Sequence, residues 1–270
     1  MTSSNINPIY FLDFAVPIIV NLFLVLYYRN KKMLPISILA ITFMAYFGAI
    51  AIKVVFQTFT VGYIIGEFGY ISPESSLYYG LQTSILEVGI AFLLARYGVR
   101  KKYFTISNAT SYGVSLSFWE NGILLGVLSG ISLISDFLII AFAPHNVSTV
   151  VYNAIKSQQP SLLYGAKAAF GLVMLSILER FSSLFAHVAW GILVVMSVTL
   201  KKRKYLYIAL PMGLIDALVP YSSVMGIVLF ELIIFALSLL FMLLALILLR
   251  EEMKRLSTMD SSSSKGIGRD

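Results

Sequence analysis

The chain has 270 residues, of which 59% are hydrophobic and 12% are charged, and its mean hydropathy is +0.87. Soluble domains carry about 25% charged residues, so this composition excludes a soluble protein and indicates a membrane protein in contact with the lipid bilayer. The net charge of +7 follows from basic residues that flank the apolar segments, where they can meet anionic headgroups, so nucleic acid is not an expected partner. The chain contains no cysteine, which excludes disulfides and thiolate metal sites.

The chain contains several apolar segments of about 20 residues each, the length that crosses roughly 30 Å of hydrocarbon as a helix. They predict an all-α, polytopic protein with about seven transmembrane helices, located in the cell membrane as a multi-pass protein. Residues 161–178 are also apolar, and we expect them to form an outer-face or partly re-entrant helix leading into the fifth span. The predicted spans are residues 9–28, 34–59, 77–98, 110–132, 177–200, 205–222 and 224–249.

The basic residues predict the orientation of these spans. Sixteen of the 20 Lys and Arg residues follow the first, third, fifth and seventh spans, which places those loops in the cytoplasm. The N-terminus is therefore predicted outside and the C-terminus inside. Residues 1–250 are expected to form a single helical membrane domain. Residues 251–270 form a polar cytoplasmic tail that we expect to be disordered, because it has too little apolar surface to order itself.

Four ionisable side chains fall at similar depths in four different predicted spans. Counted from the predicted cytoplasmic ends, each lies roughly 15–18 Å deep, at the bilayer midplane. Charge at this depth is costly and often marks a functional site. The four residues are Glu87, Glu120, His187 and Asp216.

A second group of charged residues lies nearer the outer face, where two positive charges balance two negative charges. We expect these residues to neutralise one another as buried pairs. The midplane group has no fixed positive charge at its own depth, so protons, a metal ion or water must compensate it. Protonated and hydrogen-bonded carboxyl groups are the non-functional alternative. The outer group consists of Lys53, Glu179, Arg180 and Glu231.

Helical spacing places His187 on a polar face of the fifth span. Arg180, Ser183, His187 and Gly191 recur at steps of three or four residues and share that face. This spacing makes Arg180 and Ser183 candidate binding residues beside the imidazole. A lone buried histidine can also be a packing residue, but here it shares its face with polar groups.

Proline and glycine mark the neighbouring spans. Pro220 follows Asp216 by four residues and lacks an amide N–H, so we expect the Asp216 carbonyl to be free beside the carboxyl group. An ordinary proline kink is the structural alternative. In the fourth span, Gly113, Gly122 and Gly126 permit close helix approach, which packing alone could explain.

These residues resemble the YhfC-type intramembrane proteases, distant relatives of the prenyl-protein (CAAX) proteases and PrsW, over residues 77–221. The resemblance rests on Glu87, the run from Ser115 to Gly122 that contains Glu120, Glu179–Arg180 followed by His187, and finally Asp216. It implies hydrolysis of a membrane-embedded substrate, with Glu87 as the base that activates water. Glu120, His187 and Asp216 would complete the catalytic site.

The first motif departs from the family pattern. In the family that this chain resembles, the first motif has two adjacent glutamates and an arginine within the next turn. Here Glu87 is followed by Val88, Gly89, Ile90 and Ala91, so the second glutamate and the arginine are missing. Arg96 lies nine residues beyond Glu87, about 13 Å along a helix, too far to replace that arginine without rearrangement. The resemblance therefore implies the family fold and leaves open whether the protease is active or inactive.

The sequence also permits a divalent metal such as zinc. Glu120, His187 and Asp216 form a candidate ligand set, but they are spread over three predicted helices. The only other histidine, His145, lies in an outer loop, and no H-E-x-x-H motif is present. Metal assistance is therefore compatible with the sequence but not required by it.

Three functions remain open from the sequence. The first is an intramembrane protease that acts on a transmembrane peptide. The second is a non-catalytic scaffold that binds partner helices. In span number and orientation the chain resembles the seven-helix scaffold subunit of gamma-secretase. The third is a proton- or ion-coupled transporter, for which midplane carboxyl groups are natural relays.

Overall fold

The computed structural model describes the backbone of residues 6–266 and the side chains of residues 6–259. This part of the chain is helical without strands, and seven of its helical segments are long and apolar enough to cross a membrane. The predicted all-α, multi-pass fold is therefore confirmed. The seven segments are Pro8–Asn30, Ile36–Phe68, Pro73–Arg100, Ile106–Phe142, Ala166–Thr199, Lys204–Met225 and Ile227–Met259.

Several spans combine consecutive helices of different type. Short 3₁₀ elements are η1 (Pro8–Tyr10), η3 (Ile106–Asn108) and η5 (Pro160–Leu163). Three further irregular elements are η2 (Thr83–Val88), η4 (Phe118–Leu128) and η6 (Gly213–Tyr221). The α-helices are α1 (Phe11–Asn30), α2 (Ile36–Phe68), α3 (Pro73–Gln82), α4 (Gly89–Arg100), α5 (Ala109–Ser117), α6 (Ser129–Phe142), α7 (His145–Gln158), α8 (Ala166–Thr199), α9 (Lys204–Met212), α10 (Ser222–Met225) and α11 (Ile227–Gly266).

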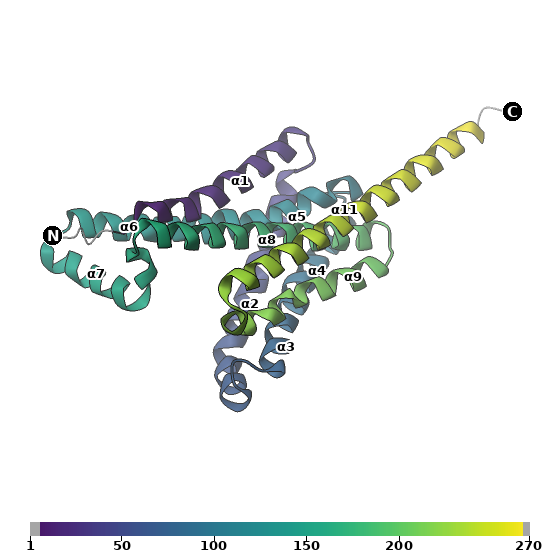
Figure 1. Cartoon of the computed structure of the whole chain (residues 1–270). Coiled ribbons are helices and arrows are strands. Elements are labelled where there is room, and N and C mark those ends of the chain that lie inside the picture. Colours follow the sequence, from purple (N-terminus) through teal and green to yellow (C-terminus); the bar gives the residue numbers. More distant parts are fainter. Residues whose placement is uncertain (1–5, 267–270) are drawn as a thin grey trace.

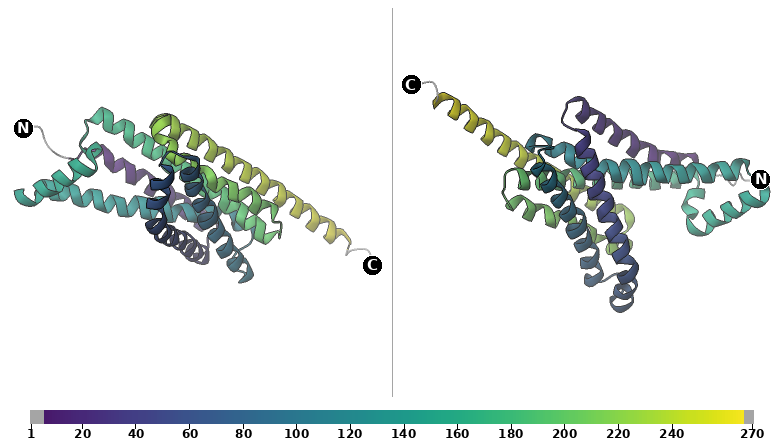
Figure 2. Two further views of the ribbon diagram at one scale, coloured as in Figure 1. Left: turned by 90° about the horizontal axis from the view of Figure 1, so that it is seen from below. Right: turned by 180° about the vertical axis from the view of Figure 1, so that it is seen from behind.

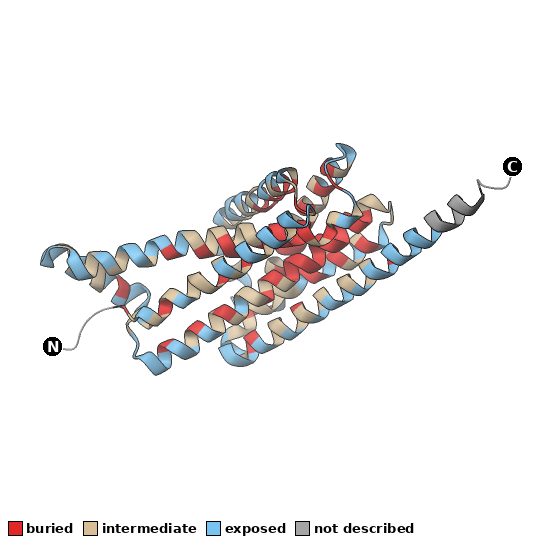
Figure 3. Cartoon of the chain, turned by 90° about the horizontal axis from the view of Figure 1, so that it is seen from above, coloured by how far each residue is buried: buried red, intermediate tan, exposed pale blue. Residues whose placement is uncertain are grey.

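Helix α8 runs through the middle of the bundle, with α11 beside it (Figure 1). In its most apolar part, 78% of residues are buried, against 11–33% in the other spans. Buried residues accordingly concentrate on α8 and its neighbours (Figure 3). The outer helices keep large apolar side chains exposed, as expected for surfaces that face lipid instead of water. The fifth span is therefore the scaffold on which the other spans are placed.

The structure corrects three predictions about the segments between and beyond the spans. Residues 166–178 lead into the fifth span as a helix, as expected, but they are part of the same helix as that span, because α8 is continuous from Ala166 to Thr199. Residues 60–76, between the predicted second span (34–59) and third span (77–98), are mostly helical, since α2 continues to Phe68 and α3 starts at Pro73. The far ends of both helices lie away from the α8 axis (Figure 1).

The tail expected to be disordered instead continues α11 as far as Gly266. Figure 2 shows this helix extending past the rest of the bundle, at the end opposite the N-terminus. Good helix formers such as Glu, Met, Lys and Leu favour continuation, and Glu252 fixes the beginning of the tail. It is 3% exposed and accepts hydrogen bonds from Lys202 Nζ and Tyr205 Oη. Residues 267–270 of the predicted tail lie outside the described residues.

The spans that carry the three midplane carboxyl groups all depart from α-helical geometry at those residues. Glu87 lies in the π-helical segment η2, and Glu120 lies in the π-helical segment η4. Asp216 lies in the 3₁₀ segment η6. Such interruptions of an α-helix in membrane proteins are tolerated where protein or a polar cavity surrounds them, and π-helical turns are frequent at functional sites.

The expectation for Pro220 is wrong about which carbonyl is released. In a 3₁₀ helix a carbonyl bonds to the N–H three residues later, so Pro220 removes the partner of Ala217 and not that of Asp216. Ser76 Oγ donates to the Ala217 carbonyl instead. The proline therefore helps to fasten η6 to α3 next to Asp216.

Close backbone approach explains Gly113. A Cβ atom at Gly113 would lie 2.6 Å from Val188 Cα and 2.8 Å from the His187 carbonyl oxygen. Gly191 meets Gly113 from the other side. These glycines let α5 approach α8 closely, which brings the span with Glu120 against the span with His187.

Candidate active site

The four predicted midplane residues line a single cavity of about 230 Å³, which we call the site cavity. They reach it from four different spans, as the depth argument anticipated. Other residues of the cavity wall come from α2 and α11, including Lys53, Glu231 and Ser238. The side chains of the four residues are partly or fully buried, with exposed fractions of 12% for Glu87, 20% for Glu120, 4% for His187 and 36% for Asp216.

Glu120, Ser183 and His187 form one half of the site. Glu120 Oε2 lies 3.2 Å from His187 Nε2 and accepts a hydrogen bond of 2.8 Å from Ser183 Oγ. His187 Nδ1 lies 2.9 Å from the Ser183 carbonyl oxygen. The predicted polar face of the fifth span is thus observed, and Ser183 is in direct contact with both ionisable groups.

The hydrogen bonds constrain the protons of this pair. A carbonyl oxygen only accepts, so His187 Nδ1 must donate to the Ser183 carbonyl. Nε2 lies 3.2 Å from Glu120 Oε2, so it can donate to the carboxylate when it carries a second proton, and it can accept from a neutral Glu120 carboxyl when it does not. The distance is short enough for a proton to pass between the two side chains. The Glu120–His187 pair can therefore act as a proton acceptor and a proton donor.

A chain of buried polar residues supports this pair from behind. Asn121 Nδ2 donates to Ser183 Oγ at 3.0 Å and to Ser117 Oγ at 3.1 Å. Ser117 in turn donates to Asn21 Oδ1, and Asn21 Nδ2 donates to the Pro17 carbonyl at 2.9 Å. Sequence reasoning missed Asn21 and Asn121. Their position in otherwise apolar spans was the available signal, since uncharged amides inside a membrane also require partners.

Two aromatic rings fix the imidazole from its sides. The Trp190 ring centroid lies 4.5 Å from that of His187, and the Tyr46 centroid lies 6.2 Å away. Such contacts restrict the rotation of the imidazole and exclude water from its faces. His187 is therefore held with Nε2 directed at Glu120.

Lys53, Thr83, Glu87 and Asp216 form the other half of the site. Lys53 Nζ lies 2.8 Å from Glu87 Oε1 and 3.7 Å from Asp216 Oδ2. It also donates to Thr83 Oγ1, which contacts Asp216 Oδ2 at 2.5 Å. One ammonium group therefore holds two carboxylates together. Glu87 is paired with a fixed positive charge in this half of the site, unlike Glu120, whose partner is an imidazole.

The prediction that Lys53 belongs to a separate outer layer is wrong. Counting residues from the cytoplasmic end of each span treats the helices as uninclined and places each charge at its Cα atom. Side chains on a helix, however, lean toward its N-terminus. Lys53 on α2 and Glu87 on the following antiparallel span lean toward each other, and the lysine stem adds several ångströms of reach. The midplane group thus has a fixed positive charge.

The remaining outer residues divide differently from the prediction. Arg180 Nη2 lies 2.5 Å from Glu179 Oε1, as expected for a neutralising pair. Glu231 has no such partner within the described residues: its Oε2 is buried without a hydrogen bond. Arg180 and Ser183, the predicted binding residues, both line the site cavity.

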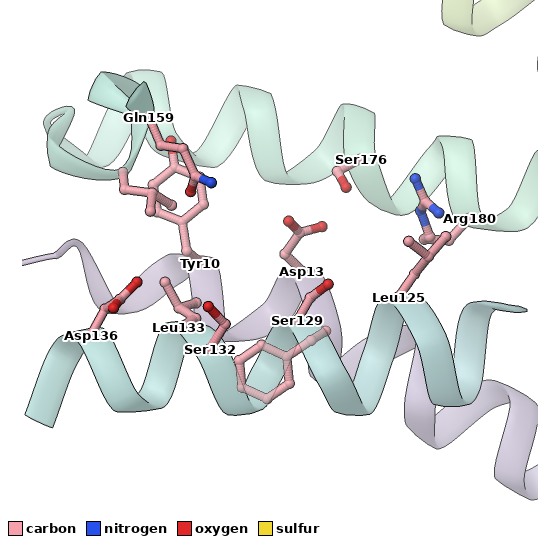
Figure 4. A pocket seen from close by; sticks show the side chains of 12 residues that line it. Tyr10, Asp13, Leu125, Ser129, Ser132, Leu133, Asp136, Gln159, Ser176 and Arg180 are labelled. Atoms are coloured by element: carbon pink, nitrogen blue, oxygen red, sulfur yellow. The ribbon is translucent and has the colours of Figure 1, made fainter. Parts of the chain in front are cut away.

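Arg180 also borders a second polar cavity of about 290 Å³, between α1, α6 and α8 (Figure 4). Asp13 points into it toward α8, with Ser129 beside it, while Gln159 and Asp136 lie farther from Arg180. Because Arg180 lines both cavities, its side chain lies at the boundary between the second cavity and the site cavity.

Comparison with known families tests the resemblance directly. The chain matches the YhfC intramembrane metalloprotease family over residues 14–236. It belongs to this family. No curated protein and no solved structure matches the chain. Membership in the YhfC family confirms the resemblance, and the match covers the four spans that carry Glu87, Glu120, His187 and Asp216.

The description of the YhfC family includes a metal, so the fit of a metal to these residues matters. Glu120 and His187 lie together, but Asp216 contacts Thr83 and Lys53 instead. Across residues 6–259, no three His, Asp or Glu side chains are grouped as metal ligands. An ammonium group beside Asp216 also opposes a cation there. In this arrangement the predicted ligand set does not fit a metal ion, and it stays a prediction.

Proposed function

We propose that this protein hydrolyses a peptide bond of a membrane-embedded substrate. The observation that carries the proposal is the 3.2 Å distance between Glu120 Oε2 and His187 Nε2, at the wall of a polar cavity that also contains Glu87, Asp216 and Lys53. A packing histidine needs neither a proton-sharing carboxyl group nor a cavity large enough for water and substrate. Membership in the YhfC family supports the same reaction class.

The Glu120–His187 pair can perform both proton transfers of hydrolysis. With His187 doubly protonated, the Glu120 carboxylate takes a proton from water as the water oxygen bonds to the substrate carbonyl carbon. The C–N bond then breaks, and the leaving nitrogen takes a proton from His187. The pair ends with one shared proton, as it began, and the products are a carboxylic acid and an amine. Ser183 keeps Glu120 in place through its 2.8 Å hydrogen bond.

Lys53 and the two other carboxyl groups have a different role in this proposal. Lys53 is a positive charge in the cavity wall and can stabilise the oxyanion of the tetrahedral intermediate. Both hydrogen bonds of Glu87 use Oε1, so this carboxylate holds Lys53 and orients water with its other oxygen. Asp216 and Thr83 complete the support of Lys53.

Water must reach the site from outside the hydrocarbon region. The second cavity is polar and shares Arg180 with the site cavity, so it supports a water route along the Arg180 side chain. Hydrolysis at the midplane then needs no opening of the bundle toward lipid for water.

The proposal is tested with purified protein in lipid nanodiscs and a quenched-fluorescent transmembrane peptide. We expect the wild-type protein to cleave the peptide and Glu120→Gln to lose activity, because the amide cannot accept the proton. Glu67→Gln, an exposed glutamate at the end of α2, is the matched control and should cleave normally. Circular dichroism and thermal unfolding must show that all three proteins are folded.

Three results would count against the proposal. Cleavage by Glu120→Gln at the wild-type rate would remove the proton-sharing pair from the reaction. No cleavage by wild-type protein of any of a set of peptides that differ in their central residues would favour a scaffold that binds partner helices. Proton-coupled uptake into liposomes that Glu120→Gln abolishes would favour the transporter.

A further inference from the structure

Helix α11 carries two polar side chains in an otherwise apolar stretch. Between Ile227 and Leu249, Glu231 and Ser238 are the only residues that are not hydrophobic. They are seven positions apart, so they lie on the same face of the helix, with Ile234 between them. All three line the site cavity, and α11 lies along α8 (Figure 1).

Both side chains are buried, and each has a polar atom without a hydrogen-bond partner. Glu231 is 4% exposed and Ser238 is 1% exposed. In the part of the chain whose side chains are described, four buried side-chain atoms lack a hydrogen bond, and two of them are Glu231 Oε2 and Ser238 Oγ. Buried polar atoms are nearly always satisfied, and each exception calls for an explanation. Here both exceptions face the same cavity.

We propose that Glu231 and Ser238 bind the main chain of the substrate, an inference that rests on the proposed proteolytic function. A peptide bond inside a helix is shielded by hydrogen bonds, so a transmembrane substrate must unwind locally before hydrolysis. Unwinding leaves N–H and C=O groups without partners in a region that contains little water. Glu231 and Ser238 supply partners for these groups on the wall that faces them.

The spacing of the two residues fits an extended peptide. Seven residues of an α-helix span about 10 Å along its axis, which equals about three residues of extended chain. A substrate running alongside α11 could therefore bond to Glu231 at one end of this segment and to Ser238 at the other. The Glu120–His187 pair and Lys53 line other walls of the same cavity, where the scissile bond would lie.

A purely structural role makes the opposite prediction for stability. A polar group that packs against the protein through hydrogen bonds destabilises the fold when it is removed, whereas replacing an unpartnered polar group with an apolar one removes a desolvation cost. We therefore expect Glu231→Leu and Ser238→Ala to unfold at the same temperature as wild type or higher. A clear fall in Tm for both variants would assign them a structural role.

The experiment measures KM and kcat for the quenched-fluorescent transmembrane peptide in nanodiscs. We expect KM to rise about tenfold for Glu231→Leu and about threefold for Ser238→Ala, with kcat within twofold of wild type, because lost ground-state binding acts on KM. Leu240→Ala, a lipid-facing residue of α11 that is 59% exposed, should change neither constant. Unchanged KM in both variants would overturn the inference while leaving the proposed hydrolysis intact.

A binding measurement separates failure of this inference from failure of the proposed function. The same peptide, carrying a photo-reactive group, is crosslinked to the Glu120→Gln protein, which is not expected to cleave it. Crosslinking should fall when Glu231→Leu is combined with Glu120→Gln in one protein. With a peptide whose central amides are N-methylated, the difference in crosslinking between the Glu120→Gln protein and this double variant should be smaller. Loss of this dependence would overturn the inference whether or not wild-type protein proves to be a protease.

Discussion

The two halves of the site solve the problem of buried charge in different ways. Glu120 Oε2 and His187 Nε2 are 3.2 Å apart, so a proton can pass between them, and the pair is supported by uncharged hydrogen-bonding groups from α5, η4 and α8. Glu87 and Asp216 are instead paired with the fixed charge of Lys53. A shared proton can move during a reaction, whereas an ion pair resists a change of charge. In the proposed hydrolysis, this difference favours proton transfer by the first half and positioning with charge stabilisation by the second.

The local backbone differs between the halves in part, since Glu120 also lies in a π-helical segment but its partner His187 does not. His187 lies on the continuous, buried helix α8, which gives it a rigid base. Glu87 and Asp216 lie on π-helical and 3₁₀ segments that are fastened by hydrogen bonds from Ser84 to Leu210 and from Ser76 to Ala217. The ion-paired half is thus assembled from two irregular segments, and its geometry depends on Lys53 and these hydrogen bonds.

The largest expected effect compares one carboxyl group from each half. We expect Glu120→Gln to lower kcat about 10³-fold, within the usual range for removing a general base, and Glu87→Gln to lower it about tenfold. The measurement is steady-state cleavage of the fluorescent transmembrane peptide, with Glu67→Gln as control. If Glu87→Gln loses as much activity as Glu120→Gln or more, Glu87 is the base that the family resemblance implies, and the division of roles given above is wrong.

The second prediction concerns stability. Lys53→Met leaves Glu87 and Asp216 without their common partner, and removing one member of a buried ion pair costs about 3 kcal/mol or more. We expect a clear fall in the free energy of unfolding, measured by denaturant titration in detergent micelles. Adding Glu87→Gln to Lys53→Met should recover part of the loss, because one unpaired charge disappears.

An additive double variant would contradict this interpretation. If Lys53→Met and Glu87→Gln destabilise the protein independently, the two side chains do not interact in the folded protein. Lys53→Arg is the matched control, since it keeps the charge and should retain most of the stability.

The contrast between the halves also shows what the sequence could predict. Periodic apolar segments were sufficient for the seven spans, and depth along antiparallel helices was sufficient to bring Glu87, Glu120, His187 and Asp216 to one cavity. Lys53 was misplaced, because helix inclination and side-chain direction are not visible in a count of residues. The π-helical and 3₁₀ turns were also invisible, since they arise from packing between spans and not from local propensity.

Zinc binding can sharpen the comparison between the halves. Glu120 and His187 supply two donors, and a third is blocked while Lys53 holds Asp216. We expect Lys53→Met to bind zinc about tenfold more tightly than wild type, because the substitution releases Asp216 as a ligand. It also removes the repulsion between the ammonium group and the zinc ion, which is about 1–2 kcal/mol. Calorimetric titration of the metal-free protein measures this directly, with Lys53→Arg as control. Tighter binding by wild type would show that the donors rearrange around the ion with Lys53 in place.

The smallest predicted effect tests the support behind the proton-sharing pair. Ser117→Ala removes the link between Asn21 and Asn121 but no contact with Glu120 or His187. Hydrogen bonds between membrane helices contribute about 0.6–2 kcal/mol, so we expect a loss of about 1 kcal/mol in the free energy of unfolding. Catalysis should fall only a few-fold, since Ser183 retains its bond to Glu120. Ser257→Ala, an exposed serine near the end of α11, is the control. A loss of activity as large as that of Glu120→Gln would mean that the polar chain positions the pair more tightly than its direct contacts do.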